Sequence, residues 1–469
     1  MQGISGWSYA PYRPFLFNGG DIYICRIVPG IDNIHFEWLE KTNEVSVFYK
    51  KVEEEKFKLA GTAKENCFDL VNLEADCDYA FYIEEESKRS RTRLARTGEY
   101  VGTIVNYLHP DDRAYAFSGQ YLCSPSMVRH PEGYLLASCD VYDNLKPQNL
   151  TLIFRSDDDG KTWHYVSELM PCFWGQMFIH KGDLYMLSVS TEYGDLLIGK
   201  STDGGKTFCA PTAILRGSCN RFIPGVHKSP MNRVTYNGRM YFTMEWGTWD
   251  NTLGDGDYFH AASVLSIAED ADLLVAENWN IAQPVKYDYS NPLAAKGKKG
   301  EIRENIEGNM VVFPDGNLYN VMRYQTTPDS DPQFGVAIVY KVNTDDPDAP
   351  LAFHKVIKFP CNNSKFLIKY DEVSGYYYCI GNYIDELKRI YHRDVLVLLK
   401  SKDAENWEVI KTLIDYKGID PMHYGFQYVD FHIEGDDIIY LCRTAMNKPH
   451  NHHDSNCITF HRIENFRNL

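Results

Sequence analysis

Alternating apolar and polar residues predict short β-strands in the first hundred residues. The runs IHFEWLE, VSVFYKKV and YAFYIEEE, all between residues 20 and 98, alternate with a period of two. This is the period of a strand that has one buried and one exposed face. Trp38 lies within these runs, where a sandwich would bury an aromatic side chain. We therefore predict a small β-sandwich over residues 1–98.

From residue 99 onward, one unit recurs six times: an apolar strand, a tight turn with glycine, and a strongly aromatic or aliphatic strand. Successive turn glycines are 49, 56, 78, 59 and 60 residues apart, and they are Gly133, Gly182, Gly238, Gly316, Gly375 and Gly435. This spacing is too long for one hairpin, has no helical periodicity, and fits four-stranded blades with loops of variable length. Residues 100–107 are expected to supply the fourth strand of the last blade and so remove an exposed edge.

A second motif recurs within these units. Ser156–Trp163 and Ser201–Phe208 both match S-x-D-x-G-x-T-[WF] and start 45 residues apart, and Ser401–Val409 is a degenerate third copy. The aspartate can cap turn amides, the glycine can adopt positive φ, and the aromatic residue can pack between strands. The motif is identified as the Asp-box, or BNR repeat.

On these motifs, residues 99–469 resemble the sialidase-like six-bladed β-propeller family. In that family the Asp-box is a structural turn on the blade rim and is not catalytic. Residues 1–98 resemble a fibronectin type III module, in which Leu73 and Tyr79 would form a tyrosine corner. The predicted fold is therefore all-β: a sialidase-like propeller with an N-terminal β-sandwich that acts as a spacer or support.

Composition narrows the function classes. The chain has 48 Lys and Arg against 64 Asp and Glu, a net charge of −16, which argues against nucleic acid or an anionic membrane surface as the main partner. Aromatic residues make up 14% of the chain, which suits β-structure and the stacking of sugar rings. No stretch approaches the ~18 apolar residues of a membrane span. The N-terminus lacks the basic and apolar regions of a signal peptide, and the twelve cysteines form no CxxC pair with zinc spacing. We expect a reduced, cytoplasmic protein without a cofactor.

Candidate site residues come from equivalent positions of the blades, because the inner strands of a propeller converge on a central pocket. The ends of the strands that follow the glycine turns offer acids and tyrosines in the first three blades and arginines later: Asp140, Glu192, Tyr193, Glu245, Arg323, Tyr383 and Arg443. The starts of the innermost strands offer a second set: Trp174, His227, Lys228, Glu307, Lys365, Tyr428 and Asp430.

Paired carboxylates with tyrosine nearby suit glycosidic chemistry, in which one acid protonates the leaving oxygen and a second group attacks or directs water. The catalytic candidates are Asp140, Glu192, Tyr193, His227, Glu245 and Tyr383. Arginines bind a carboxylate through paired hydrogen bonds, so an acidic sugar is the expected ligand. The substrate-binding candidates are Trp174, Lys228, Arg323, Tyr428, Asp430 and Arg443.

The sequence departs from the sialidase pattern in its first blade. Sialidases open the first inner strand with an Arg-Ile-Pro motif, whereas Cys123 or Ser124 stands at that place here, and the similar RFIPG segment at Arg221 lies between blades two and three. Two of the three carboxylate-binding arginines, Arg323 and Arg443, carry over. The nucleophile pair is left open between Tyr383 or Tyr428 and Glu192 or Glu245. This departure argues against true sialidase activity.

Two other functions remain open. In a polysaccharide lyase, His227 or a tyrosine would abstract the C5 proton of a uronate while a cation neutralises the carboxylate. In a non-catalytic propeller, the same pocket would bind a glycan or a protein. The segment HNHHDSN from His450 to Asn456 is interpreted as a solvated loop rather than a metal site, because nothing in the sequence fixes a ligand geometry. No metal is therefore expected.

Overall fold

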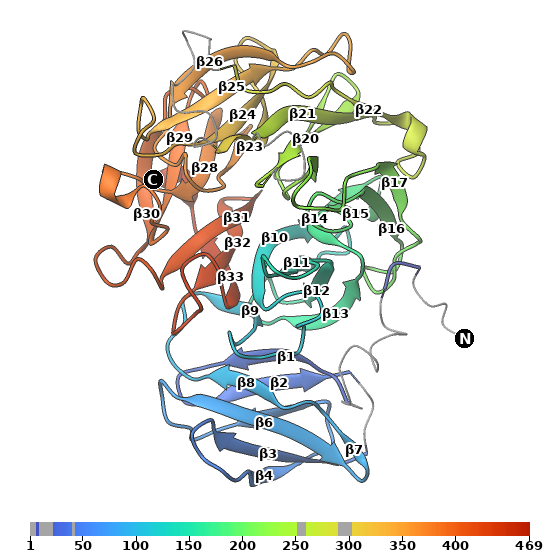
Figure 1. Ribbon diagram of the computed structural model, residues 1–469, viewed down its shortest axis with the longest axis vertical. Coiled ribbons are helices and arrows are strands. Elements are labelled where there is room, and N and C mark those ends of the chain that lie inside the picture. Colours follow the sequence, from blue (N-terminus) through green and yellow to red (C-terminus); the bar gives the residue numbers. More distant parts are fainter. Residues whose placement is uncertain (1–5, 9–21, 40–42, 251–258, 289–302) are drawn as a thin grey trace.

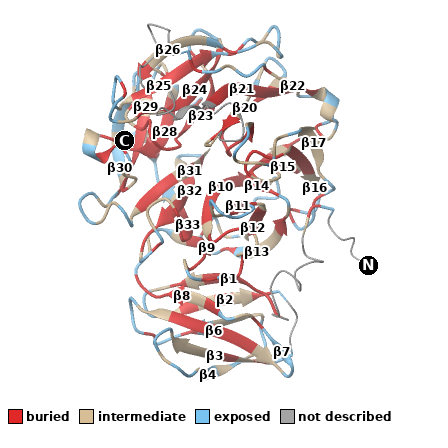
Figure 2. Ribbon diagram, in the orientation of Figure 1, coloured by how far each residue is buried: buried red, intermediate tan, exposed pale blue. Residues whose placement is uncertain are grey.

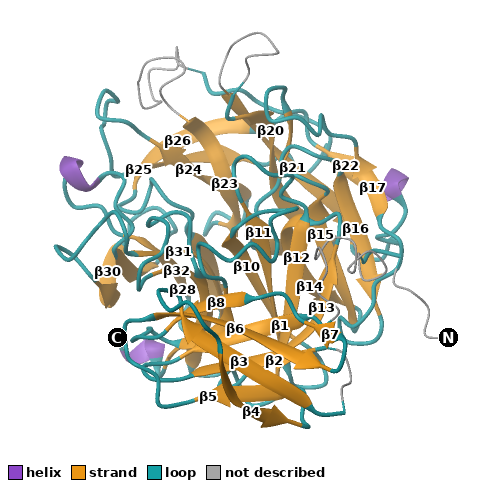
Figure 3. Cartoon of the chain, turned by 60° about the horizontal axis from the view of Figure 1, so that its bottom comes forward, coloured by secondary structure: helices purple, strands orange, loops and turns teal. Residues whose placement is uncertain are grey.

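The computed structural model describes residues 6–8, 22–39, 43–250, 259–288 and 303–469. Six antiparallel sheets are arranged around a central axis as a six-bladed propeller, and two further sheets from the N-terminal region lie beside it (Figure 1). In the described part of the chain, helix is limited to short 3-10 turns: η2 (Ala276–Asn278), η3 (Leu387–Arg389) and η4 (Phe466–Asn468) (Figure 3). None of the described helices is long and apolar enough to cross a bilayer.

The N-terminal region is a sandwich of two sheets. One sheet has the order β1 (Ile24–Pro29), β2 (Ile34–Trp38), β5 (Cys67–Leu70), and the other β4 (Lys58–Ala63), β3 (Val45–Lys51), β6 (Asp78–Glu85), β7 (Lys88–Arg89), with β8 (Arg93–Arg96) also paired to β6. Trp38 and Phe36 lie in the apolar core between the sheets, with the Phe36 ring 4.7 Å from that of Phe81. The Tyr79 hydroxyl accepts a hydrogen bond from the backbone N–H of Glu74 at 2.9 Å.

Blades 1 to 3 follow in chain order, and each is built from consecutive strands. Blade 1 contains β10 (Tyr121–Arg129), β11 (Leu135–Tyr142), β12 (Leu150–Ser156) and β13 (His164–Leu169). Blade 2 contains β14 (Phe173–His180), β15 (Asp183–Val189), β16 (Leu196–Ser201) and β17 (Thr212–Leu215). Blade 3 contains β18 (Gly225–His227), β19 (Arg233–Tyr236), β20 (Arg239–Thr248), β21 (Phe259–Ala268) and β22 (Trp279–Ile281). Its inner strand is divided into β18 and β19 around Pro230, because proline cannot donate to the ladder.

Blades 4 to 6 complete the ring. Blade 4 contains β23 (Arg303–Val312), β24 (Leu318–Gln325), β25 (Val336–Lys341) and β26 (Ala352–Lys358). Blade 5 contains β27 (Leu367–Asp371), β28 (Tyr376–Asn382), β29 (Val395–Ser401) and β30 (Glu408–Asp415). Blade 6 contains β31 (Gly425–Glu434), β32 (Asp437–Ala445), β33 (Cys457–Ile463) and β9 (Thr103–Tyr107). The predicted closure by residues 100–107 is confirmed, since β9 pairs with the C-terminal strand β33.

The six repeated glycine turns are the hairpins that join the first and second full strands of the blades. All six glycines have positive φ, between 59° and 95°, the backbone conformation that glycine adopts without steric cost. The degenerate and complete S-x-D motifs are also alike in three dimensions. Asp158 and Asp203 each accept a backbone N–H bond from a threonine four residues later, at 2.8 and 2.9 Å, and Asp403 caps its own turn in a similar way.

Polar side chains link neighbouring inner strands around the axis. Ser126 Oγ accepts the N–H of Met177 at 3.0 Å, Asn309 Oδ1 accepts that of Ile368 at 2.8 Å, and Asp430 Oδ2 accepts that of Met127 at 2.7 Å. The last of these bonds joins blade 6 to blade 1. Blade order and closure therefore depend on directional hydrogen bonds as well as on the packing of apolar side chains between blades. Figure 2 shows that most strand residues of the propeller are buried.

Candidate functional site

Four inner strands share one irregularity near their starts. The pairing register between first and second strands shifts at Cys123/Ser126, Phe173/Gln176, Ile306/Asn309 and Gln427/Asp430. Each bulge contains a non-glycine residue with positive φ: Ser124 (47°), Trp174 (50°), Glu307 (53°) and Tyr428 (55°). Such conformations are uncommon and cost on the order of 1 kcal/mol or more each, and a bulge re-aims the side chain that it carries.

All four residues line one central cavity of about 460 Å³. Its wall takes side chains from every blade and is mostly polar: Cys123, Ser124, Tyr142, Asn144, Trp174, Glu192, Arg221, His227, Trp249, Asp250, Glu307, Arg323, Gln325, Arg393, Tyr428, Arg443 and His453. Six of the twelve predicted site residues are among them, namely Glu192, His227, Trp174, Arg323, Tyr428 and Arg443. The repeated bulges therefore build a single site from sequence-distant strands.

Three arginines surround Tyr428 in this cavity. Arg323 Nη1 donates to Glu307 Oε2 at 2.6 Å and to the Tyr428 hydroxyl at 3.2 Å. The guanidinium carbons of Arg393 and Arg443 lie 5.5 and 5.0 Å from the centre of the Tyr428 ring. Burial opposes ionisation of Glu307, but Arg323, with smaller contributions from His227 and Lys365, lowers the pKa of this carboxyl below its usual value. Glu307 is therefore a carboxylate at neutral pH.

Arg393 and Arg443 have no carboxylate partner within ion-pair distance in the described part of the chain. Arg393 donates to the Gln427 side-chain oxygen, and Arg443 donates to the His453 carbonyl. Burial, together with Arg323 and Arg443, lowers the pKa of Arg393 to about 10, so it stays charged. Two positive charges thus face the cavity with neutral hydrogen-bond partners only, which is the arrangement of an anion site.

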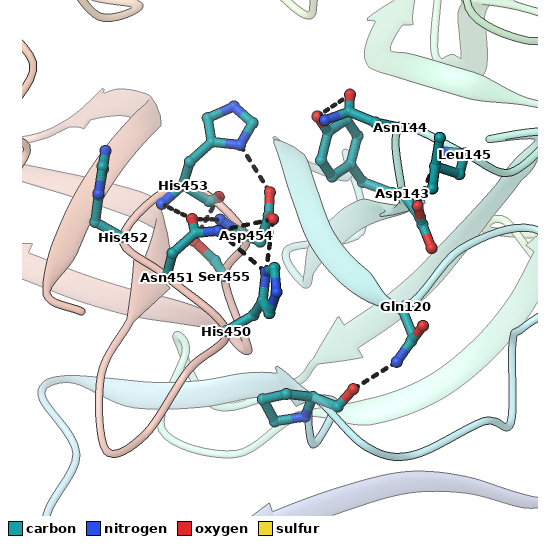
Figure 4. Close-up of polar contacts among 12 residues, drawn as sticks. Gln120, Asp143, Asn144, Leu145, His450, Asn451, His452, His453, Asp454 and Ser455 are labelled. Carbon is teal, nitrogen blue, oxygen red and sulfur yellow. Dashed lines mark hydrogen bonds and ion pairs between the residues drawn. The ribbon is translucent and has the colours of Figure 1, made fainter. Parts of the chain in front are cut away.

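The His450–Asn456 segment is solvent-exposed at its start, as the sequence suggested, but it is buried from Asp454 onward, and its His453 carbonyl accepts a hydrogen bond from Arg443. Asp454 is nearly buried and lies 2.9 Å from Nδ1 of both His450 and His453, while Asn451 Oδ1 accepts the N–H groups of His453 and Asp454 (Figure 4). Burial opposes ionisation of Asp454, but the hydrogen bonds from these two histidines hold the pKa of its carboxyl below the usual range. The described residues contain no group of three or more side chains placed to hold a metal ion.

Figure 4 also shows the neighbouring loop after β11 and the segment between β9 and β10. The Tyr142 hydroxyl contacts Asn144, the Leu145 N–H bonds to Asp143, and Gln120 donates to the Pro110 carbonyl at 2.6 Å.

Burial and Arg443 lower the pKa of His453 to about 3. His453 is therefore neutral at physiological pH and does not add a fourth positive charge to the cavity.

The acidic wall of the cavity centres on Glu192 and His227. Glu192 is 7% exposed, and Gln148 Nε2 donates to its Oε2 at 3.1 Å. Burial raises the pKa of Glu192, so its protonated form persists to higher pH than that of an exposed glutamate. His227 Nδ1 lies 2.6 Å from Glu245 Oε2, and its ring packs 4.4 Å from that of Trp174.

Four predicted residues are buried behind the cavity and do not line it. Lys228 follows His227 in the chain, and adjacent residues of an extended segment point to opposite sides. Tyr193 follows Glu192 in a turn, where its positive φ of 59° directs its side chain away from the cavity. Lys228 Nζ instead donates to Gln176 at 2.6 Å. Glu245 supports His227 from behind. Asp140 accepts a bond from Thr151 Oγ1 at 2.5 Å, and burial raises its pKa to about 8.

Tyr383 and Asp430 lie outside the cavity. Tyr383 follows β28 and packs against the apolar cluster between blades 4 and 5. Asp430 lies two residues beyond the Tyr428 bulge, and it faces another cavity, of about 720 Å³, further along the inner strands. Tyr428, one of the two predicted tyrosines, does line the central cavity, where it shares Arg323 as a hydrogen-bond donor with Glu307.

Arg393 and His453 were not found from the sequence. Arg393 lies two residues before β29 and His453 four residues before β33, the third strands of their blades. In an antiparallel sheet the start of the third strand lies beside the end of the second. Charged or polar residues just before these strands, as in HRDVLVLLK, are the signal that would have indicated them.

Comparison with known proteins supports the fold. No protein-family model and no curated protein matches the chain. Among solved structures, the Hadza microbial sialidase Hz136 is 12% identical with a TM-score of 0.50, over 95% of this chain and 96% of that one. The leech intramolecular trans-sialidase is 8% identical (TM-score 0.48, 95% and 96%), and the Penicillium chrysogenum α-L-arabinanase 14% identical (TM-score 0.49, 78% and 98%). The likeness to Hz136 over nearly the whole chain shows a sialidase-like propeller fold.

Proposed function

We propose that this protein is a glycoside hydrolase that removes an acidic sugar from a glycan. The observation that carries the proposal is the group of three arginines around Tyr428, two of which have no carboxylate partner among the described residues. A sugar carboxylate between Arg393 and Arg443 would supply the missing negative charge. The pocket also presents Trp174, a flat aromatic side chain beside the polar wall.

Tyr428 is the proposed nucleophile. Its phenolic oxygen attacks the anomeric carbon, and Glu307, held by the same guanidinium nitrogen, accepts the phenolic proton. A carboxylate nucleophile would be repelled by a carboxylate on the sugar, whereas a neutral phenol is not. A tyrosine nucleophile is one of the known alternatives to the usual pair of carboxylates.

Glu192 is the proposed general acid. Its raised pKa keeps the proton available for the glycosidic oxygen, and the bond from Gln148 to Oε2 leaves Oε1 to carry that proton. Once the leaving group departs, the Glu192 carboxylate takes a proton from the water that attacks the anomeric carbon. The bond from that carbon to Tyr428 breaks, and Glu307 returns its proton to the phenolic oxygen. Two successive displacements at the anomeric carbon give net retention of configuration.

A second candidate is a uronate lyase, and the His227–Glu245 pair is the observation that favours it. A buried carboxylate at 2.6 Å from Nδ1 orients the ring, which is the arrangement of a general base that abstracts a C5 proton. In this reaction the same arginines would neutralise the uronate carboxylate.

A turnover screen of the purified protein on acidic oligosaccharides separates the candidates. New reducing ends without ultraviolet absorbance are the result expected for the hydrolase. A 4,5-unsaturated product that absorbs in the ultraviolet would establish the lyase instead. Binding of the same oligosaccharides without either product would contradict both enzymes and support a glycan-binding propeller.

A further inference from the structure

A separate cavity, called here the distal cavity, lies at the other end of the propeller axis from the central cavity. It has a volume of about 720 Å³ and is lined mostly by the later halves of the inner strands, in blades 1, 2, 3, 5 and 6. The central cavity takes residues near the starts of these strands, and the two walls have no residue in common. The volume falls within the roughly 300–1,000 Å³ of small-molecule sites.

Two cations face the distal cavity without a carboxylate partner among the described residues. Lys369 on β27 is half-buried, and its ammonium makes no hydrogen bond or ion pair in the described part of the chain. It lies 5.6 Å from the centre of the Phe431 ring. Arg233 on β19 is also half-buried, and its Nη2 donates to the Ile179 carbonyl at 2.9 Å. Both charges are therefore available to a ligand.

The two cations are close enough to affect one another. Burial lowers the pKa of Lys369, Asp430 opposes this, and Arg233 adds to it. Burial also lowers the pKa of Arg233. A third cation, Lys365, is fully buried near Asp430, and its hydrogen-bond partner is the Val429 carbonyl at 3.3 Å. An anion in the cavity would be attracted by these charges and would offset the cost of their burial.

Most other charged groups of the wall are already paired, neutral or screened. Arg129 forms ion pairs with Glu434 and with Asp159. Burial lowers the pKa of His432 to about 4, so this ring is neutral at physiological pH. Glu372 is exposed at the rim, where water and salt screen its charge. Within the cavity, one carboxylate therefore opposes the two unpaired cations.

That carboxylate belongs to Asp430. Its Oδ2 accepts the Met127 N–H at 2.7 Å, whereas its Oδ1 has no donor among the described residues. A free carboxylate oxygen of this kind accepts a hydrogen bond from a hydroxyl group. Apolar side chains, among them Met177, Phe178 and Met231, complete the wall and suit the C–H groups of a compact ligand.

We infer that the distal cavity is a binding site for a small hydroxylated organic acid. The carboxylate of the ligand lies between Lys369 and Arg233, where charge-assisted hydrogen bonds hold it. A hydroxyl group of the ligand donates to Asp430 Oδ1. The inference does not depend on the reaction proposed for the central cavity, because no wall residue is shared.

Methionine methyl groups give a readout that belongs to the distal cavity. Met127, Met177 and Met231 line it, whereas the described wall of the central cavity contains no methionine. The full-length protein is labelled with carbon-13 at its methionine methyl groups, and the three signals are assigned by replacing each residue with leucine. D-glucuronate, a hydroxylated acid, is the probe in the titration, and D-glucose is the matched compound without a carboxylate.

We expect D-glucuronate to shift the three methyl signals saturably and D-glucose to leave them unchanged at the same concentrations. Lys369→Gln should weaken the binding of D-glucuronate at least about tenfold, because it removes one charge from the carboxylate site. Lys411→Gln, which replaces an exposed lysine on the outer strand β30 of the same blade, should bind like the wild type. The shifts should persist in Arg443→Ala, because Arg443 belongs to the central cavity.

Four results would overturn the inference: no shift with D-glucuronate, equal binding of D-glucose, unchanged affinity in Lys369→Gln, or loss of the shifts in Arg443→Ala. Cyclohexanecarboxylate tests the hydroxyl groups in the wild type, without any substitution. It should bind at least about tenfold more weakly than D-glucuronate, since nothing in it donates to Asp430. Equal or tighter binding would overturn the assignment of a hydroxylated ligand. Failure of the proposed function would appear as absent turnover in the oligosaccharide screen and would leave these methyl shifts in place.

Discussion

At the residue scale, the site depends on a few side chains in unusual backbone conformations. Glu307 and Tyr428 both have positive φ within a bulge, and both reach Arg323. Neither residue type favours that conformation, so the surrounding strands must impose it. Strain of this kind is retained where the direction of a side chain matters to the site.

Replacement of Tyr428 by phenylalanine tests the nucleophile. We expect a loss of turnover on the order of a thousandfold or more with normal folding, because the attacking oxygen is removed and the ring is kept. Tyr383→Phe is the matched control, since Tyr383 packs outside the cavity. Steady-state kinetics of both variants make the comparison. Equal effects in the two variants would exclude Tyr428 as the nucleophile.

The pH profile tests Glu192 as the acid. Its pKa is raised by burial, so the protonated, active form persists to higher pH than for an exposed glutamate and is lost as pH rises through the raised pKa. We expect kcat/KM to fall on the alkaline side of that pKa. In Glu192→Gln this limb should disappear, together with most of the activity towards poor leaving groups. An unchanged alkaline limb would assign the acid to another group.

At the element scale, the sequence predicts the repeated strands better than it predicts their details. The turn glycines, such as Gly133, and the closing strand at residues 100–107 follow from periodicity and edge chemistry, and the structure confirms both. The bulges at Trp174 and Tyr428 do not follow, because one extra residue leaves a short apolar pattern almost unchanged. A shift of one residue decides which of two neighbours faces the cavity, as Glu192 and Tyr193 show.

The bonds between blades give an element-scale prediction. Asp430→Ala removes the charged acceptor of the Met127 N–H, so we expect the free energy of unfolding to fall by about 1.5–3 kcal/mol. Ser126→Ala removes the equivalent neutral acceptor from Met177 and should cost about 1 kcal/mol. Urea titration measures both. A larger effect for Ser126→Ala would contradict the idea that Asp430 secures the ring where it closes.

At the scale of the whole molecule, the N-terminal sandwich and the propeller share a buried interface. Ile104 and Tyr107 of β9 belong to the same apolar cluster as Phe36 and Phe81 of the sandwich. Arg93 Nε donates to Asp112 Oδ2 at 2.7 Å, and both side chains are almost fully buried. The strand that closes the propeller therefore also anchors the sandwich, which supports a structural role for this region.

Loss of the buried ion pair should weaken the whole molecule. We expect Arg93→Ala to lower the free energy of unfolding by about 3–5 kcal/mol, because Asp112 is left buried without its partner. Lys58→Ala, which breaks an exposed pair with Glu54, should leave stability nearly unchanged. Calorimetry would show whether the sandwich and the propeller of the Arg93→Ala variant unfold in one thermal transition or in two. A separate early transition of the sandwich alone would contradict a shared interface.

The central claim is that Arg393 and Arg443 hold a sugar carboxylate during hydrolysis. The most direct measurement compares kcat/KM for an acidic 4-methylumbelliferyl glycoside with that for its uncharged carboxamide, in the wild type and in Arg443→Ala. The account predicts that the wild type prefers the acid by about a hundredfold or more, and that the variant loses most of this preference. Equal rates on the acid and the carboxamide in the wild type would contradict it.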